Sequence, residues 1–325
     1  MATIKDVAKE AGVAVETVSR VMNNRGYISQ KTKDKVHEAM KKLGYTPNSF
    51  AQGLSKKNMD CIAVIVPSVS HPYFSSIVYN LECEASLRGY KVFLYDSNGD
   101  VRKESQALRI CQSSFVSGVL LFSADIPAEF LEKLKIPVAL VERNPVGSTI
   151  SVQCDNAMGG RLAFDHLISC GCKNMIVIST MNQIDMPGDL RESAFVARAN
   201  ELGIAIKIYD AKYNDFINMS YHKIINQALD ENPDCDGIFA TSDLIAAEVI
   251  QCCVKRGRSI PSDVKLVGYD DVPLASITTP TLTTIRQPIK EIAVNAIEAI
   301  EALHDGIYTP KGVTLPVTLI KREST

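Results

Sequence analysis

From Cys61 to the end of the chain, short β-rich runs alternate with helical stretches. The β-rich runs include Ile62–Val66, Lys91–Tyr95, Gly118–Phe122, Val138–Val141, Met175–Ser179, Gly237–Ala240, Lys265–Val267 and Leu315–Lys321. The helical stretches include Phe74–Arg88, Ala157–Cys170, Arg191–Leu202 and Leu244–Lys255. Such alternation produces parallel sheets with helices on both faces, which predicts an α/β fold. Roughly ten or more strands in ~260 residues are too many for one ordinary sheet, so we expect two doubly wound lobes.

The N-terminal region has a different pattern, that of three short helices. Thr3 can cap the first helix, with Asp6 three residues later as its capping-box partner. Apolar residues then recur with helical spacing at Ile4, Val7, Ala8 and Ala11. A second helix is expected over about Val15–Met22, and a third begins after Ser29 and ends at Gly44. This region therefore predicts a small all-α unit.

Charge separates the two regions. Residues 1–57 contain 11 Lys and Arg against 5 Asp and Glu, a net charge of +6, whereas the whole chain carries −2, so the remainder carries −8. A basic region on an acidic body is expected when only that region meets a polyanion such as DNA. A solvated basic helical surface would show the same charge.

The segment between the two regions is polar and contains a candidate helix over Asn48–Leu54. A helix that short does not persist alone in water, so we expect it to form only when a partner holds it. The predicted domains are a head over residues 1–46, a hinge helix and linker over 47–60, and a body over 61–325. Within the body we expect an N-lobe of about 61–155 and 287–313, and a C-lobe of about 156–286 and 314–325.

Two short helices joined by a tight turn, the second with a polar outer face, are typical of a helix-turn-helix that enters the major groove. The outward side chains of the second helix are Val15, Glu16, Thr17, Ser19, Arg20 and Asn23. Arg20 can pair bidentately with guanine, Glu16 can accept from a cytosine amino group, and Val15 can contact a thymine methyl. The other three side chains are sized to contact phosphates. The alternative is a structural three-helix bundle without DNA contacts.

Five stretches of the N-terminal region form one specific motif: Ala2–Ala8, Ala11–Val13, Thr17–Asn23, Leu43–Asn48 and Ala51–Leu54. Together they resemble the head and hinge helix of the lactose-repressor (LacI/GalR) family. The resemblance implies DNA contacts for Thr3, Lys5, Tyr45, Ala51 and Leu54. It also implies that paired hinge helices of a dimer enter the minor groove, where Leu54 wedges into the central base step and bends the duplex. Ala14 departs from the family's usual Ser or Thr cap, and the missing cap costs ~1 kcal/mol.

The body contains looser anchors of the same resemblance. They are Val66–Ser68 leading to Pro72–Phe74, the pair Asp155–Asn156, Leu266–Asp271, and Pro280–Pro288. They imply the family's sensor, a two-lobed fold like that of type I periplasmic binding proteins. In such sheets ligands lie beyond the carboxyl ends of strands. The candidate effector-binding residues are Tyr73, Phe74, Ser123, Asp155, Arg191, Ser242, Asp243 and Asp270.

These candidates have different expected roles. By resemblance, Arg191 and Asp270 match the family's main polar effector contacts, and Tyr73 or Phe74 stacks on a ring. A cation and an anion on facing loops suit a polyhydroxylated ligand, but they can equally form a structural ion pair. Asp155 and Asp243 are further contacts or simply helix N-caps. Ser242 stands where many sugar-binding members have Asn, and His71 is read as a loop histidine rather than a ligand contact.

Several classes of site are absent from the sequence. No glycine-rich nucleotide motif, P-loop or hydrolase motif occurs, so we expect no catalytic residues and no cofactor. None of the nine cysteines has C-x-x-C spacing, so we expect reduced, mostly buried thiols rather than a metal site. The chain has neither a signal-peptide layout nor a membrane-spanning apolar run, which predicts a cytoplasmic protein without membrane contact.

We therefore expect a sequence-specific DNA-binding transcriptional repressor whose affinity for a double-stranded, pseudo-palindromic operator is controlled by a small molecule, most simply a carbohydrate. A homodimer is expected, because no C-terminal leucine heptad of the kind that builds a tetramer follows the last strand. A cytoplasmic sugar or nucleoside binding protein, a regulator controlled by a phosphoprotein, and an enzyme on a doubly wound sheet are the alternatives.

Overall fold

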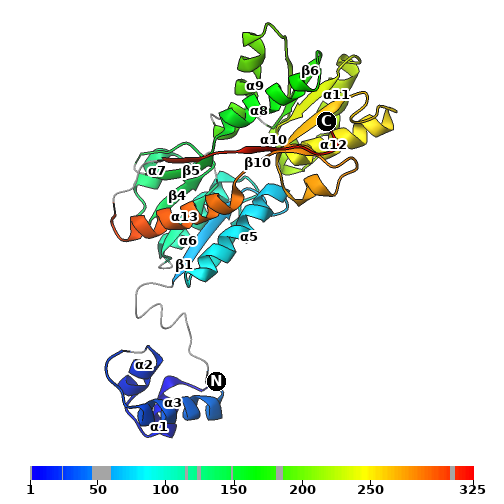
Figure 1. The fold of residues 1–325 in the computed structure, drawn as a ribbon. Coiled ribbons are helices and arrows are strands. Elements are labelled where there is room, and N and C mark those ends of the chain that lie inside the picture. Colours follow the sequence, from blue (N-terminus) through cyan, green and yellow to red (C-terminus); the bar gives the residue numbers. More distant parts are fainter. Residues whose placement is uncertain are drawn as a thin grey trace. The chain divides into compact units, whose positions relative to one another are not determined.

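The structure, a computed structural model, describes residues 2–23, 25–45, 60–113, 116–122, 126–147, 149–180, 186–307 and 312–325. The chain divides into two compact units, Met1–Met59 and Asp60–Thr325, which are drawn in Figure 1. Each unit is described separately below. No helix in the described ranges is both long and apolar enough to cross a membrane.

The head contains the three predicted helices, α1 (Ile4–Ala11), α2 (Val15–Met22) and α3 (Gln30–Leu43). The capping box is formed as expected, because Thr3 N donates to Asp6 Oδ2 at 2.8 Å and Asp6 N donates to Thr3 Oγ1 at 3.4 Å. Helix α2 lacks a side-chain cap at Ala14. One valine from each helix is fully buried in the core of the head: Val7, Val18 and Val36.

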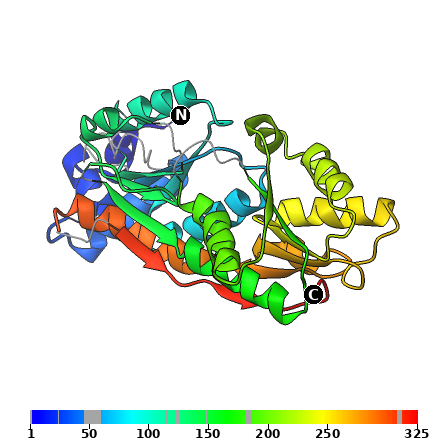
Figure 2. The ribbon, with the colours of Figure 1, turned by 90° about the horizontal axis from the view of Figure 1, so that it is seen from above.

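The body contains two six-stranded sheets, one in each lobe (Figure 2). The N-lobe sheet has the order β11-β5-β4-β3-β1-β2 and is wholly parallel. Its strands are β1 (Cys61–Val66), β2 (Lys91–Asp96), β3 (Gly118–Leu121), β4 (Val138–Val141), β5 (Ile150–Cys154) and β11 (Gly312–Leu315). The C-lobe sheet has the order β12-β10-β9-β8-β6-β7 and is parallel except for β12. Its strands are β6 (Met175–Ser179), β7 (Lys207–Asp210), β8 (Gly237–Ala240), β9 (Lys265–Asp270), β10 (Thr283–Arg286) and β12 (Thr318–Ile320).

Helices cover both faces of each sheet, which confirms the predicted doubly wound α/β fold. The N-lobe helices are α5 (Pro72–Leu87), α6 (Val101–Ser113), α7 (Ala128–Glu132) and α13 (Ile289–His304). The C-lobe helices are α8 (Asn156–Ser169), α9 (Leu190–Glu201), α10 (Tyr213–Ile217), α11 (His222–Glu231) and α12 (Asp243–Lys255), with 3-10 turns at Pro187–Asp189 and Pro273–Ser276. Buried side chains of β1 alternate between the two faces: Ile62 and Val64 pack with α5 and α13, whereas Ala63 and Ile65 pack with α6.

The chain passes between the lobes three times. The first passage follows Cys154, the second lies between Arg286 and Ile289, and the third lies between Leu315 and Thr318. The first and third passages are joined, since Asp155 N donates to the carbonyl oxygen of Leu315 at 2.8 Å. Any change in the angle between the lobes must therefore be absorbed at these short connections.

Candidate effector site and DNA-binding face

A cavity lies between the lobes at the carboxyl ends of strands from both sheets. Pro67 and Phe122 follow β1 and β3 in the N-lobe, and Thr180 and Ser242 follow β6 and β8 in the C-lobe. In both sheets these are the neighbouring strands at which the order reverses, which is where open α/β sheets bind ligands. The hollow measures about 1050 Å³ including its opening to solvent. That is enough room for a small molecule.

Aromatic side chains from both lobes form one wall of the cavity. The ring of His71 lies 5.5 Å from Phe74, and both rings approach Phe216 of the C-lobe, at 5.7 and 6.4 Å between centroids. Phe216 lies on α10, as does Tyr213, whose hydroxyl donates to the carbonyl oxygen of Gly99 in the N-lobe at 2.5 Å. Helix α10 thus closes one side of the cavity by direct contacts across the two lobes.

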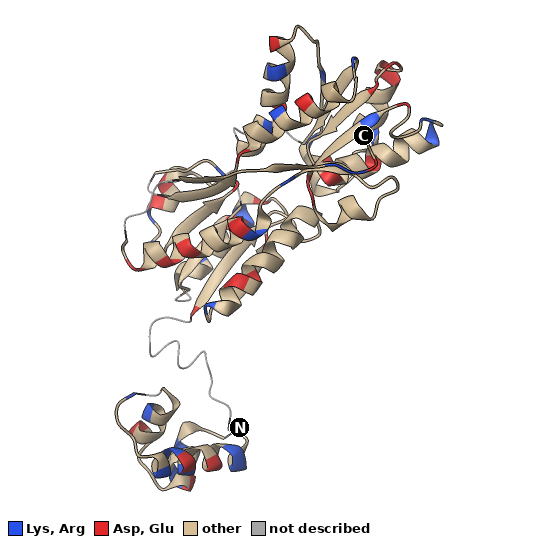
Figure 3. Cartoon of the chain, viewed as in Figure 1, with Lys and Arg blue, Asp and Glu red and all other residues tan. Residues whose placement is uncertain are grey.

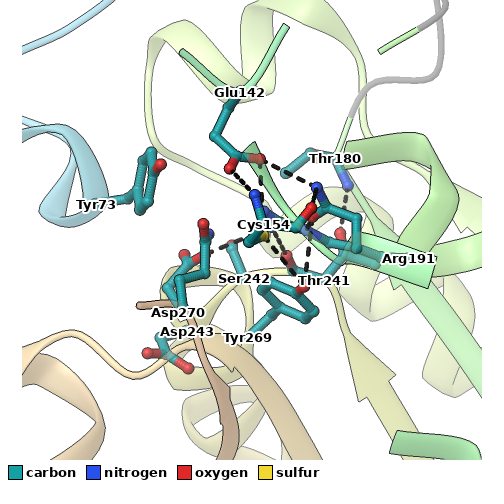
Figure 4. A network of polar contacts seen from close by, with 12 residues as sticks. Tyr73, Glu142, Cys154, Thr180, Arg191, Thr241, Ser242, Asp243, Tyr269 and Asp270 are labelled. Carbon is teal, nitrogen blue, oxygen red and sulfur yellow. Dashed lines mark hydrogen bonds and ion pairs between the residues drawn. The ribbon is translucent and has the colours of Figure 1, made fainter. Parts of the chain in front are cut away.

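Arg191 organises the polar side of the cavity (Figure 4). Its Nε donates to Asn156 Oδ1 at 2.7 Å, and its Nη1 donates to the Thr241 carbonyl at 2.9 Å and to Asp270 Oδ1 at 3.4 Å. The guanidinium carbon also lies 3.8 Å from the centre of the Tyr269 ring, a cation–π contact. Because the Arg191 side chain is only 12% exposed, these partners hold it in one orientation.

Glu142 brings a carboxylate from the N-lobe to the same network. It follows β4 and has a left-handed backbone with φ of 52°. Its carboxylate accepts from Cys154 N at 2.6 Å and from Asn156 Nδ2 at 3.0 Å. Asn156, which is 1% exposed, therefore bridges a carboxylate of one lobe and the guanidinium of Arg191 in the other.

Asp270 is held in an unusual conformation at the end of β9. Its φ of 111° is rarely adopted by residues other than glycine, which indicates a backbone constrained by its surroundings. The carboxylate accepts from Gln287 Nε2 at 2.7 Å, and Gln287 lies on the second passage between the lobes. Burial raises the pKa of Asp270 to about 6, although the positive charge of Arg191 opposes this shift.

The second helix of the head presents an exposed face. Val15, Glu16 and Arg20 are exposed on α2, while Thr17 and Ser19 are half-buried. The positions of Lys and Arg along the ribbon of the head are coloured blue in Figure 3. The face combines an apolar, an acidic and a basic group in one and a half turns, which is the mixture that can contact base edges.

Two parts of the chain match models of known protein families. Residues 3–48 match the family model described as bacterial regulatory proteins, lacI family, and residues 164–325 match the periplasmic binding protein-like domain. The ribose operon repressor of Halalkalibacterium halodurans is 33% identical over all of this chain and 97% of its own length. The sucrose operon repressor of Streptococcus mutans is 34% identical over all of this chain and 99% of its own length.

The chain belongs to the lacI family of bacterial regulatory proteins. It is therefore a DNA-binding transcriptional regulator with a helix-turn-helix head and a two-lobed sensor body. A solved structure agrees with this assignment. The periplasmic binding protein/LacI transcriptional regulator of Alkaliphilus metalliredigens, complexed with D-xylulofuranose, is 30% identical and covers 82% of this chain and 99% of its own, with a TM-score of 0.75.

Five of the predicted effector residues of this lacI-family chain line the cavity: Tyr73, Phe74, Arg191, Ser242 and Asp270. Ser242 also caps α12, because its Oγ accepts from Ile245 N at 3.3 Å. Arg191 and Asp270 form an ion pair, one of the two roles considered for them from the sequence. Both side chains also line the cavity, so the ion pair is compatible with a role in effector binding.

Two predicted effector residues lie outside the described lining of the cavity. Asp155 caps α8 by accepting from Met158 N at 2.8 Å, which favours the N-cap alternative. Asp243 is fully buried, and its carboxylate accepts from Val272 N at 2.9 Å and from Thr284 Oγ1 at 2.6 Å. Ser123, together with Ala51 and Leu54 of the hinge, lies outside the described residues.

The structure adds cavity residues that the sequence interpretation did not select. Glu142 follows a predicted strand, so the carboxyl-end rule could have identified it. The sequence predicts a loop histidine at His71, whereas the structure places His71 at the cavity as the N-cap of α5. Phe216 and Tyr213 come from a five-residue helix after an edge strand, and no sequence pattern places them there.

Of the predicted DNA contacts, Thr3 is exposed as the N-cap of α1, Lys5 is exposed on α1, and Tyr45 is half-buried after α3. The Thr3 hydroxyl is already used in the capping box, where it donates to Asp6 Oδ2 at 2.8 Å. Asn23 donates through Nδ2 to the Ser19 carbonyl at 2.8 Å, so its amide also has a partner within the head. Arg20, Glu16 and Val15 remain the proposed base-reading residues.

Proposed function

We propose that a carbohydrate bound between the lobes controls how tightly the head binds operator DNA. The observation that carries this proposal is the cavity itself, which combines an aromatic wall with the buried polar network around Arg191 and Asp270. Aromatic faces pack against the apolar faces of sugar rings, and charged groups make the strongest hydrogen bonds to hydroxyls. Relatives named ribose and sucrose operon repressors support a sugar over other small molecules.

The proposed coupling is mechanical. Contacts with an effector would set the angle between the lobes through Asn156, which directly follows the first passage and bonds to Glu142, and through Gln287, which lies on the second passage. In a homodimer the two hinge segments, residues 47–60, would then change their separation over a pseudo-palindromic operator. Since a short hinge helix forms only when DNA holds it, a small shift changes operator affinity. Leu54 and Ala51 are the proposed minor-groove contacts.

We propose no catalytic role for the chain and a cytoplasmic location, because its proposed partner is operator DNA. Among the described residues, His, Cys, Asp and Glu do not gather into a set that could hold a metal ion. All nine cysteines are free thiols.

Thermal-shift screening of the full-length protein tests the carbohydrate proposal. Ribose, sucrose, xylulose and cellobiose form the first panel, with adenosine and uridine as nucleoside controls. A sugar that raises the Tm and binds in isothermal titration supports the proposal. A nucleoside that binds while every sugar fails would contradict it.

A further inference from the structure

His71 places a neutral hydrogen-bond donor at the cavity. It is the N-cap of α5, where its Nδ1 accepts from Tyr73 N at 3.3 Å. Because Nδ1 accepts, the ring proton lies on Nε2, and Nε2 is buried without a partner among the described residues. Burial, together with the nearby charge of Arg191, lowers the pKa of His71 to about 4. The imidazole is therefore uncharged at neutral pH.

Tyr73 places a second uncharged polar group at the same wall. Its side chain is buried and lines the cavity, and its hydroxyl also has no partner within the described chain. In Figure 4 the Tyr73 ring stands apart from the dashed contacts of the Arg191 network. Burial raises the pKa of Tyr73 well above its ordinary value, so the phenol stays protonated. Buried polar groups are rarely left unpaired, which indicates that a bound molecule supplies acceptors here.

The charges of the described lining disfavour an anionic ligand. Three carboxylates (Glu104, Glu142 and Asp270) stand against two guanidiniums (Arg143 and Arg191). Arg191 already donates to Asn156, Thr241 and Asp270, and Arg143 Nη1 donates to the Glu142 carbonyl at 2.7 Å. A phosphate dianion would add two negative charges to a partly desolvated site that is already acidic.

We infer that the effector is an uncharged, unphosphorylated sugar whose oxygens accept hydrogen bonds from His71 Nε2 and Tyr73 Oη. A hydroxyl or ring oxygen accepts from both donors without adding charge. The phosphate group of a phosphorylated sugar would instead be repelled by the carboxylates of the cavity lining. This inference rests on the proposed function, because it assumes that the cavity binds a carbohydrate. It adds which chemical form of the sugar is bound and which two residues select it.

Matched pairs of free and phosphorylated sugars test the inference by isothermal titration with the full-length protein. The pairs are ribose and ribose 5-phosphate, xylulose and xylulose 5-phosphate, sucrose and sucrose 6-phosphate, and glucose and glucose 6-phosphate. We expect one free sugar to bind at least about tenfold more tightly than its phosphate ester, a difference of about 1.4 kcal/mol. A phosphate ester that binds more tightly than its free sugar would overturn the inference and leave the carbohydrate proposal standing. Failure of every sugar in both forms would overturn the carbohydrate proposal as well.

Two Tyr→Phe variants test whether a buried hydroxyl contributes to sugar binding only when it lines the cavity. Tyr73 and Tyr221 both have buried hydroxyls without partners among the described residues, but only Tyr73 lines the cavity. Tyr73→Phe should weaken binding of the free sugar roughly threefold to tenfold, the loss expected for one hydrogen bond. Tyr221→Phe should leave it unchanged. Neither change should lower the Tm of the sugar-free protein, since neither hydroxyl has a partner to lose among the described residues.

His71→Asn tests the second donor while keeping the helix cap. The Asn side chain can still accept from Tyr73 N, as Asn is a preferred N-cap, but it is too short to present a donor at the Nε2 position. We expect a loss of free-sugar affinity similar to that of Tyr73→Phe with an unchanged far-ultraviolet circular dichroism spectrum. Wild-type affinity in both variants would overturn the assignment of these two donors.

Discussion

Arg191 donates from Nε to Asn156 Oδ1 at 2.7 Å, and this bond ties the cavity to the first passage between the lobes. Asn156 begins α8 directly after that passage, and its Nδ2 donates to Glu142 of the N-lobe at 3.0 Å. An effector that shifts Arg191 therefore shifts a contact that joins the lobes. The same residue serves ligand binding and domain geometry, so its mutation affects both.

Arg191→Ala should lower the free energy of unfolding by about 3 kcal/mol, because it leaves the buried Asn156 and Asp270 without their cationic partner. It should also abolish the effect of sugar on operator affinity. Urea unfolding and operator titration of the same variant measure the two effects. Arg198→Ala, on the same helix but with solvent-exposed partners, is the control and should change neither. Wild-type stability and wild-type sugar response in Arg191→Ala would contradict this assignment.

Asp270 should make both sugar affinity and stability depend on pH, with opposite signs. Its pKa is raised to about 6 in the folded protein, above the unfolded value of about 3.9. The folded state therefore holds the proton more tightly, so the contribution to stability is present at low pH and is lost as pH rises through about 6. Sugar affinity should fall below pH 6, because the neutral acid makes weaker hydrogen bonds.

The variant Asp270→Asn isolates this group. Sugar affinity measured from pH 5 to 8 should show an inflection near 6 in wild type that is missing in the variant. His71 adds no inflection to sugar affinity over this range, since its pKa near 4 leaves it uncharged in the folded protein. The difference in unfolding free energy between the two proteins should change between about pH 4 and 6 and stay level above that. An inflection that persists in Asp270→Asn would assign the titration to another group.

Gly99 should control the approach of α10 to the N-lobe. A methyl group at Gly99 would lie 2.0 Å from the Tyr213 hydroxyl, the group that donates to the Gly99 carbonyl. Gly99→Ala should therefore weaken sugar binding by holding the lobes apart. Gly89→Ala is the matched control, because Gly89 also has a positive φ but its methyl would meet nothing within 4 Å. Both variants should lose about 1 kcal/mol of folding stability, because alanine is strained at a positive φ. Only Gly99→Ala should also bind sugar more weakly. Equal affinities in the two variants would show that this contact does not matter for binding.

Much of the fold could be predicted because burial on both sheet faces produces continuous apolar runs. The run at Ile62–Val66 became β1, extended by one residue to Cys61. Strand β7, Lys207–Asp210, was not expected, because it lies at a sheet edge and three of its four residues are exposed. Because three of its four residues are exposed, β7 leaves no continuous apolar run in the sequence.

The site could be predicted only in part, for a related reason. Asp270 and Ser242 could be predicted as site residues because open parallel sheets bind ligands at the carboxyl ends of their strands, where both residues lie. The same rule also selected Asp243, whose carboxylate turns instead to Val272 N and Thr284 within the lobe. Phe216 reaches the cavity from a five-residue helix, and only the packing of one lobe against the other places it there.

Arg20 should carry base readout in the head. It is exposed on α2, so Arg20→Ala should not lower the stability of the head. The change should cost about 1–3 kcal/mol on an operator selected from a random-sequence library and relax the preference at one base pair per half-site. Fluorescence anisotropy on the selected operator and on scrambled DNA measures this. Equal weakening on both DNAs would make Arg20 a phosphate contact.

The central claim is that sugar bound between the lobes changes the operator affinity of the head. The direct measurement is anisotropy titration of the full-length protein on labelled operator at fixed salt, with and without a saturating concentration of a sugar shown to bind by calorimetry. The account predicts a change in operator Kd of about tenfold or more, equivalent to a coupling free energy of about 1.4 kcal/mol. A sugar that binds the protein and leaves the operator Kd unchanged would contradict it.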